Sequence, residues 1–122
     1  MSTYKHKPFV YVAGPISKGM MRDNVRLGIF GADRVWEMGA IPFCPHTSHF
    51  WDMISPHGYE EWLDMDFEVI SRCDALLRLP GESKGADREV AFAREQQIPV
   101  FHDEAALAEW LKTWGQVKAG AR

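Results

Sequence analysis

The sequence predicts an α/β protein whose doubly wound parallel sheet is covered by helices on both faces. Two observations lead to this fold class. Short apolar runs with the length of buried strands alternate with stretches in which apolar residues recur at helical spacing. Connections between parallel strands are right-handed, so such alternation places helices on both sides of one sheet. With 122 residues and a 46% apolar composition, the chain is expected to form a single domain over 1–122, with its core at about 8–114.

The first third of the chain predicts a strand, a helix and a second strand. Residues 8–13 (PFVYVA) form an apolar run that ends at the turn signal Gly14-Pro15. Apolar residues then recur at helical spacing over about 24–38, and the following glycine is a helix stop. Residues 40–44 form the second apolar run.

The middle of the chain interrupts this alternation. Residues 45–58 (PHTSHFWDMISPHG) are predicted to be a long polar and aromatic loop, and loops of this length are usually functional or mobile. A helix is predicted at about 59–72. It leads into the strand 74–79 (DALLRL), which ends at Pro80-Gly81.

The last third predicts a helix at about 86–97, a strand at 98–101 (IPVF) and a terminal helix at about 103–114. Asp103 is the expected N-cap of the terminal helix. In a doubly wound sheet, ligands bind at the carboxyl ends of the strands near a topological switch point. The segments 13–19 (AGPISKG), 45–58 and 80–89 (PGESKGADRE) are therefore expected to converge on one site.

Composition excludes several classes of function. The net charge is −3 and Lys and Arg are scattered, which argues against binding to duplex nucleic acid. No apolar run approaches the roughly 18 residues of a membrane span, and the first residues do not look like a signal peptide, so we expect a cytoplasmic protein. Cys44 and Cys73 lack metal-site spacing and are expected to be buried, reduced thiols.

One carboxylate falls on an apolar helix face. In the helix predicted from Tyr59, the stripe Tyr59, Leu63, Ile70 and Cys73 includes Asp66. An unpaired carboxylate in that position would cost several kcal/mol, so Asp66 is expected either to line a pocket or to form a buried cap or salt bridge.

A second carboxylate opens the helix at 86–97. Glu89 is predicted in its first turn, where the helix dipole favours an ionised carboxylate at neutral pH, and complementing that dipole is an alternative role. Two carboxylates facing one pocket suggest substitution at an anomeric carbon. The three histidines of 45–58 have irregular spacing and no acid or cysteine completes a familiar set, so neither a metal nor another cofactor is expected.

Three blocks together resemble a known superfamily. VYVAGPIS at the first strand, DFEVISRCD before the third strand and SKGADRE at the following helix are similar to the nucleoside 2-deoxyribosyltransferase-like proteins. That superfamily includes the 2'-deoxynucleoside 5'-phosphate N-hydrolases and the DUF4406 proteins of bacteria and phages, to which the likeness is greatest. The resemblance covers about 9–101 and implies a flavodoxin-like sheet of four or five strands in three α/β/α layers.

The resemblance also implies roles for three residues. Glu89 matches the glutamate that attacks C1' of a deoxyribose to form a glycosyl-enzyme intermediate. Asp66 matches an acid placed near the base and the sugar, and Tyr11 matches the tyrosine that orients the glutamate. Pro15 stands where the monophosphate hydrolases have a phosphate-binding serine, and 86–88 replaces their glycine-rich approach to the glutamate.

Further residues are candidates for substrate binding. Gly14 and Pro15 would form the turn under the sugar, and Ser17 is placed to donate to a phosphate. His46 and Trp51, from the long loop, are candidates for the base pocket. Ser83 and Gly85 match a loop that contacts the sugar or its 5' substituent.

The predicted function is cleavage of the N-glycosidic bond of a nucleoside or nucleotide, by an N-glycosidase or deoxyribosyltransferase-like enzyme. A binding or sensing protein of the same fold without turnover is the first alternative. A structural protein in which Asp66 is paired within the core is the second. The resemblance implies a homodimer or a larger homo-oligomer.

Overall fold

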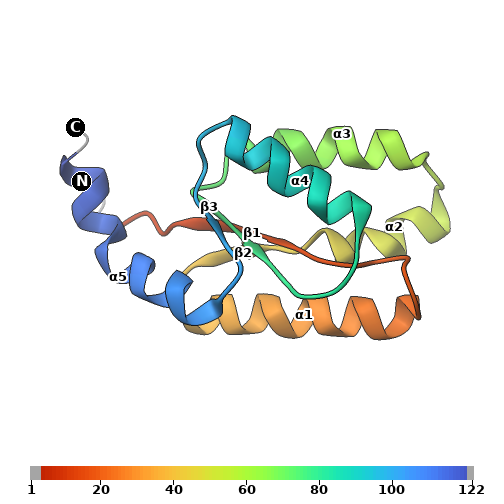
Figure 1. Ribbon diagram of the computed structural model, residues 1–122, viewed down its shortest axis with the longest axis horizontal. Coiled ribbons are helices and arrows are strands. Elements are labelled where there is room, and N and C mark those ends of the chain that lie inside the picture. The colour runs from red at the N-terminus through yellow and green to blue at the C-terminus, as the bar shows by residue number, and fades with distance from the viewer. Residues whose placement is uncertain (1–3, 121–122) are drawn as a thin grey trace.

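In residues 4–120, which the computed structural model describes, four parallel strands form one sheet (Figure 1). Side chains are described as far as residue 114. The strand order is β2-β1-β3-β4. The strands are β1 (Phe9–Ala13), β2 (Ile41–Phe43), β3 (Ala75–Arg78) and β4 (Val100–Phe101).

Helices cover both faces of the sheet, which confirms the predicted three-layer α/β/α fold class. Two helices, α1 and α5, lie on one face, and α3 and α4 lie on the other (Figure 1). A short helix, α2, follows β2. The helices are α1 (Met21–Glu37), α2 (Ser48–Ile54), α3 (Tyr59–Ile70), α4 (Lys84–Glu95) and α5 (Glu104–Gly120), and a 3-10 turn spans Pro45–Thr47.

The alternating side chains of β1 divide the core into two clusters. Val10 and Val12 pack with residues of α1 and α5, whereas Tyr11 and Ala13 pack with residues of α3 and α4. All four side chains are completely buried. Successive side chains of a strand point to opposite faces, so an apolar run with no polar alternation is what a strand buried on both faces requires.

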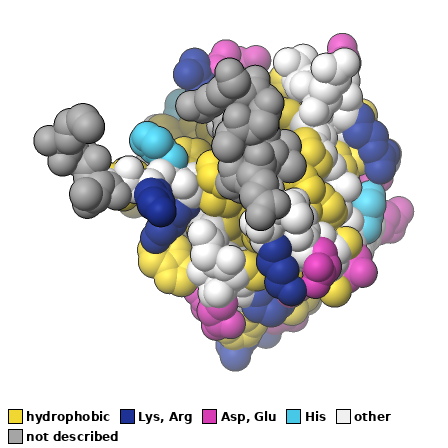
Figure 2. Space-filling view, turned by 90° about the vertical axis from the view of Figure 1, so that its left-hand side faces the viewer, with side chains coloured by type: hydrophobic (Ala, Val, Ile, Leu, Met, Phe, Trp, Pro, Cys, Tyr) yellow, Lys and Arg dark blue, Asp and Glu magenta, His cyan; other side chains and the backbone are white. Residues whose placement is uncertain are grey.

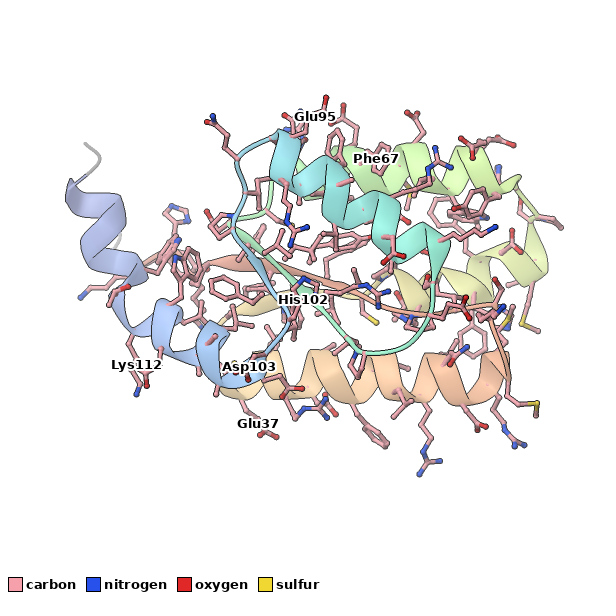
Figure 3. The ribbon with its side chains drawn as sticks, viewed as in Figure 1. Glu37, Phe67, Glu95, His102, Asp103 and Lys112 are labelled. Carbon is pink, nitrogen blue, oxygen red and sulfur yellow. The ribbon has the colours of Figure 1, made fainter. Side chains whose placement is uncertain are left out.

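Contacts between helices tie the α3 and α4 layer together. Phe67 of α3, labelled in Figure 3, stacks on Phe92 of α4 with ring centroids 4.4 Å apart. Cys73 packs in the same cluster, and Cys44 is buried near the end of β2. Both cysteines are free thiols, as predicted.

The main departure from the predicted elements lies in 45–58. The predicted loop contains the 3-10 turn and α2. The side chains of Phe50, Met53 and Ile54 are exposed, so α2 has no apolar stripe facing the core from which a helix could have been predicted. Two helices also begin earlier than expected, α1 at Met21 and α4 at Lys84.

The chain direction places the switch point at β1. From β1 the chain adds β2 on one side and then β3 and β4 on the other. The order in which strands are added therefore reverses at β1, and the switch point lies between β1 and β3. The carboxyl ends of these strands point towards α2 (Figure 1). Figure 2 shows the opposite end, where basic and acidic side chains are interspersed. Among the described residues, no helix is both long enough and apolar enough to cross a membrane.

Candidate active site

A cavity of about 780 Å³ opens at the carboxyl ends of β1 and β3. Its walls come from the loop after β1, from α2, from α3 as far as Asp66 and from the first half of α4. This is the position predicted from the switch point. The predicted site residues that line it are Gly14, Ser17, Asp66, Ser83, Gly85 and Glu89.

Two carboxyl groups and a tyrosine, from three elements, meet beneath this cavity. Asp66 lies on α3, Glu89 on α4 and Tyr11 on β1, and their exposed fractions are 8%, 5% and 0%. The Tyr11 hydroxyl donates a hydrogen bond to Glu89 Oε2 over 2.5 Å. Asp66 is near enough to both other side chains to influence their pKa values. Asp66, which interrupts the apolar stripe of α3, therefore lines the same cavity as Glu89.

Burial controls the protonation of this trio. Desolvation raises the pKa of Glu89 to about 8, although the hydrogen bond from Tyr11 opposes this shift. Desolvation also raises the pKa of Asp66 to about 6. The pKa of Tyr11 is raised by burial and by the two neighbouring carboxyl groups, so Tyr11 remains a hydrogen-bond donor. Two carboxyl groups in one buried site resist double ionisation, and the pair therefore retains one proton near neutral pH.

The prediction that the helix dipole keeps Glu89 ionised was wrong. The helix begins at Lys84, so Glu89 lies in its second turn, beyond the first-turn amides. Removal of the carboxyl group from water has the larger effect and raises its pKa. Near neutral pH, where the pair retains one proton, Glu89 is an anion only when that proton resides on Asp66.

We expect the free energy of unfolding to fall as the pH rises from about 4.5 to about 8. The folded-state pKa of Glu89 lies above the ordinary value of 4.5, so the folded protein holds more protons than the unfolded chain in this window and loses stability as they dissociate. Glu89→Gln should be more stable than wild type at pH 8 by at least about 1 kcal/mol. Urea unfolding at several pH values gives the free energy of unfolding as a function of pH for wild type and for Glu89→Gln. If it changed equally with pH in the two proteins, this expectation would be contradicted.

The separation of the two carboxyl groups bears on their chemistry. Retaining glycosidases place two carboxyl groups about 5 to 5.5 Å apart, on either side of the scissile bond. Asp66 and Glu89 are near enough for each carboxyl group to influence the pKa of the other. Two carboxyl groups that share one proton can provide an anion and a proton donor in the same site.

A buried arginine supports the site, and it was not predicted from the sequence. Arg78 ends β3 and donates hydrogen bonds to the carbonyl oxygens of Leu79 and Gly81 and to the Asp87 carboxylate. Its positive charge lowers the pKa of Glu89. The signal was present in DALLRL, where a charge interrupts an apolar strand as Asp66 interrupts an apolar helix face.

The segment 86–88 has structural roles at this site. The Ala86 side chain packs into the core from α4, and the Asp87 carboxylate lies 3.0 Å from the Arg78 guanidinium. Arg88 forms two hydrogen bonds with the Glu60 carboxylate, of 2.7 and 3.2 Å, and lies over the Tyr59 ring. The segment thus fixes the orientation of α4 against β3 and α3, and with it the position of Glu89.

The loop that leads into α4 forms the mouth of the cavity. Ser83 is the N-cap of α4, and its hydroxyl accepts a hydrogen bond from the Ala86 amide. A side chain at Gly85 would come within 3.3 Å of the Tyr59 hydroxyl. Across the mouth, Lys18 forms an exposed ion pair with Glu82 at 3.5 Å. Ser17 lines the cavity beside Lys18.

Two predicted base-pocket residues and Pro15 are not among the residues that line the cavity. His46 is buried behind it, with Nε2 at 3.0 Å from the Pro15 carbonyl oxygen and Nδ1 at 3.3 Å from Cys44 Sγ. Burial lowers the pKa of His46. The neutral ring therefore donates from Nε2 to Pro15 and supports the turn at the cavity floor. Trp51 is 51% exposed and packs edge-on against Trp62.

A glycine on α1 gives His46 its space. A Cβ atom at Gly28 would lie 2.5 Å from the imidazole ring. We therefore expect Gly28→Ala to destabilise the fold by about 1 to 3 kcal/mol, although alanine normally stabilises a helix interior. Denaturant unfolding measures the change, with the exposed Arg22→Ala of the same helix as control. A stabilised Gly28→Ala protein would contradict the packing of His46 against α1.

The structure adds cavity residues that the sequence did not single out. They come from α2, from the segment that follows it and from the first half of α3, where the sequence predicted a loop and a charged helix face. The principal ones are His49, Asp52, His57, Tyr59 and Trp62. Among the described residues, no group of three or more His, Cys, Asp or Glu side chains is arranged to hold a metal ion.

Comparison with known proteins agrees with this architecture. Among solved structures, a 2-deoxyribosyltransferase from the psychrotolerant bacterium Bacillus psychrosaccharolyticus matches with a TM-score of 0.58 and 19% identity, over 75% of this chain and 69% of that chain. The likeness confirms that the two proteins share a fold. No curated protein matches the sequence. A family profile described as a domain of unknown function, DUF4406, matches residues 8–102. This match covers most of the sequence and confirms the predicted likeness, so the chain belongs to the DUF4406 family.

Proposed function

We propose that the protein cleaves the N-glycosidic bond of a nucleoside or nucleotide, with Glu89 as the nucleophile. The observation that carries the proposal is the buried Tyr11, Glu89 and Asp66 trio at the base of a large cavity. The shared fold with a 2-deoxyribosyltransferase supports it, because that protein is described as a biocatalyst for the synthesis of nucleosides.

In the proposed reaction, a Glu89 carboxylate oxygen attacks C1' of the sugar. The shared proton first moves from Glu89 to Asp66. The bond between C1' and the base nitrogen then breaks, its electron pair stays with the base, and the proton passes from Asp66 to the base as it leaves. The product is a sugar ester of Glu89. Water then releases the sugar in hydrolysis, or a second base accepts it in transfer.

The surroundings of Glu89 suit this chemistry. A carboxylate removed from water stabilises a developing sugar cation more strongly than a solvated one. Tyr11 donates to Oε2 of Glu89, and the other carboxylate oxygen is the proposed attacking atom. Arg78 acts at longer range and favours the ionised form. Deoxyribose forms such a cation more readily than ribose because it lacks an electron-withdrawing 2'-hydroxyl group.

Incubation with a panel of deoxynucleosides, ribonucleosides and their monophosphates tests the proposal. We expect free base to be released from at least one deoxy substrate, as measured by chromatography. Parallel reactions with a second free base distinguish transfer from hydrolysis. Binding without release across the panel would contradict enzymatic turnover and favour a nucleotide-binding protein.

A further inference from the structure

The wall formed by α2 and the first half of α3 is placed to recognise the base, given the proposed function. Trp62 and Asp66 both line the cavity and lie four residues apart on α3, roughly 6 Å along the helix axis. A sugar whose C1' is next to Glu89 and Asp66 therefore has room for its base alongside Trp62. The basic side chains of the cavity, Lys18, Lys84 and Arg88, come from the opposite loop and from α4.

The most constrained polar group on this wall is the Asp52 carboxylate. Its Oδ1 atom accepts hydrogen bonds from the Trp62 indole Nε1 at 2.7 Å and from the His57 backbone amide at 2.9 Å. Trp62 is itself held by edge-on contacts with Trp51 and His57, at 5.0 and 5.2 Å. The two donors lie on α3 and on the segment that precedes it, and they fix the orientation of the carboxylate.

Only one oxygen of this carboxylate remains for a ligand. In the described part of the chain, Oδ2 of Asp52 has no hydrogen-bond donor, whereas Oδ1 has two. The hydrogen bond from His57 and then that from Trp62 lower the pKa of Asp52. The group is therefore an anion at neutral pH, which accepts hydrogen bonds and donates none.

We propose that Asp52 selects nucleobases that present an exocyclic amino group over their keto counterparts. An amino group donates a hydrogen bond to Oδ2, whereas a keto oxygen in the same place opposes one acceptor with another and leaves both unpaired. Cytosine is thus favoured over uracil, and adenine over hypoxanthine. The same negative charge repels a phosphate, which places the 5' end of the ligand on the side of Lys18 and Lys84.

The Asp52→Asn substitution is expected to reverse the preference between amino and keto nucleobases. The Trp62 indole and the His57 amide can donate only to the carbonyl oxygen of asparagine, so this oxygen takes the place of Oδ1. The amide NH2 group then takes the place of Oδ2. This group donates hydrogen bonds. The preference should therefore change from the amino to the keto member of each pair.

Binding to a protein that cannot turn over separates recognition from catalysis. In the Glu89→Gln background, calorimetry measures the affinities for deoxycytidine, deoxyuridine, deoxyadenosine and deoxyinosine. We expect each amino nucleoside to bind about tenfold or more tightly than its keto partner. Asp52→Asn should reverse both ratios, and Asp64→Asn, at an exposed position of α3, should leave them unchanged.

Each outcome decides the inference. The measured quantity is the ratio of the affinities for the amino and the keto nucleoside in one variant, so a loss of affinity for both does not change it. Equal affinities for both members of each pair, or a preference unaffected by Asp52→Asn, would overturn the role of Asp52, and so would the failure of all four nucleosides to bind. If Asp52→Asn does not fold, Asp52→Ala takes its place in the same background: loss of the amino preference supports the role of Asp52, and an unchanged preference overturns it. A preference for amino nucleosides without base release by the wild type would contradict the proposed catalysis and leave this inference standing.

Discussion

Glu89→Gln is expected to lower base release by at least about a thousandfold. Glutamine keeps the shape of the side chain and still accepts the Tyr11 hydrogen bond, but it is too weak a nucleophile to form the sugar ester. Substrate binding should change little, because the loss concerns the transition state. Steady-state kinetics with the best substrate of the panel measures the effect.

The matched control is Glu95→Gln, on the same helix. Glu95 is exposed at the far end of α4 (Figure 3) and is not among the cavity residues. Its replacement should leave kcat and KM within about twofold of wild type. If the two substitutions lowered activity equally, or if Glu89→Gln retained activity, Glu89 would not be the nucleophile.

Asp66→Asn is expected to lower kcat by about a hundredfold or more for substrates with a poor leaving group. The amide cannot supply the proton that the departing base requires. The fall in kcat should be much smaller for a nucleoside whose base departs readily as an anion, because such a base does not need to be protonated as it leaves. Comparing kcat for the two kinds of substrate in wild type and variant isolates the proton-transfer role.

A purely structural role of Asp66 predicts a different pattern. In that case Asp66→Asn would lower activity on both kinds of substrate equally, together with the free energy of unfolding. Asp64→Asn, at an exposed position of the same helix, controls for the loss of a negative charge.

Much of the fold was predictable because its signals are local. Residues 8–13 are apolar on both faces of β1, and that pattern arises from a strand covered by helices on both sides. The position of Asp66 on an apolar stripe was equally local, and it led to the cavity wall. Such features depend on residues a few positions apart in sequence.

The remaining features depend on contacts between distant segments. His46 was a reasonable cavity candidate by its loop position, but Gly28 and Pro15 enclose it from behind. The pKa of Glu89 depends on burial beneath α3, which the dipole argument did not include. Asp52 acquires its orientation from Trp62, ten residues away, and no local pattern indicates that contact.

The most direct test of the proposed mechanism is the mass of the intact protein during turnover. After rapid mixing with a reactive deoxynucleoside and acid quenching, the protein should gain the mass of one deoxyribosyl group, and peptide mapping should locate that group on Glu89. The Glu89→Gln protein should gain none. Base release by the wild type without any adduct, or an adduct on another residue, would contradict the assignment of Glu89 as the nucleophile.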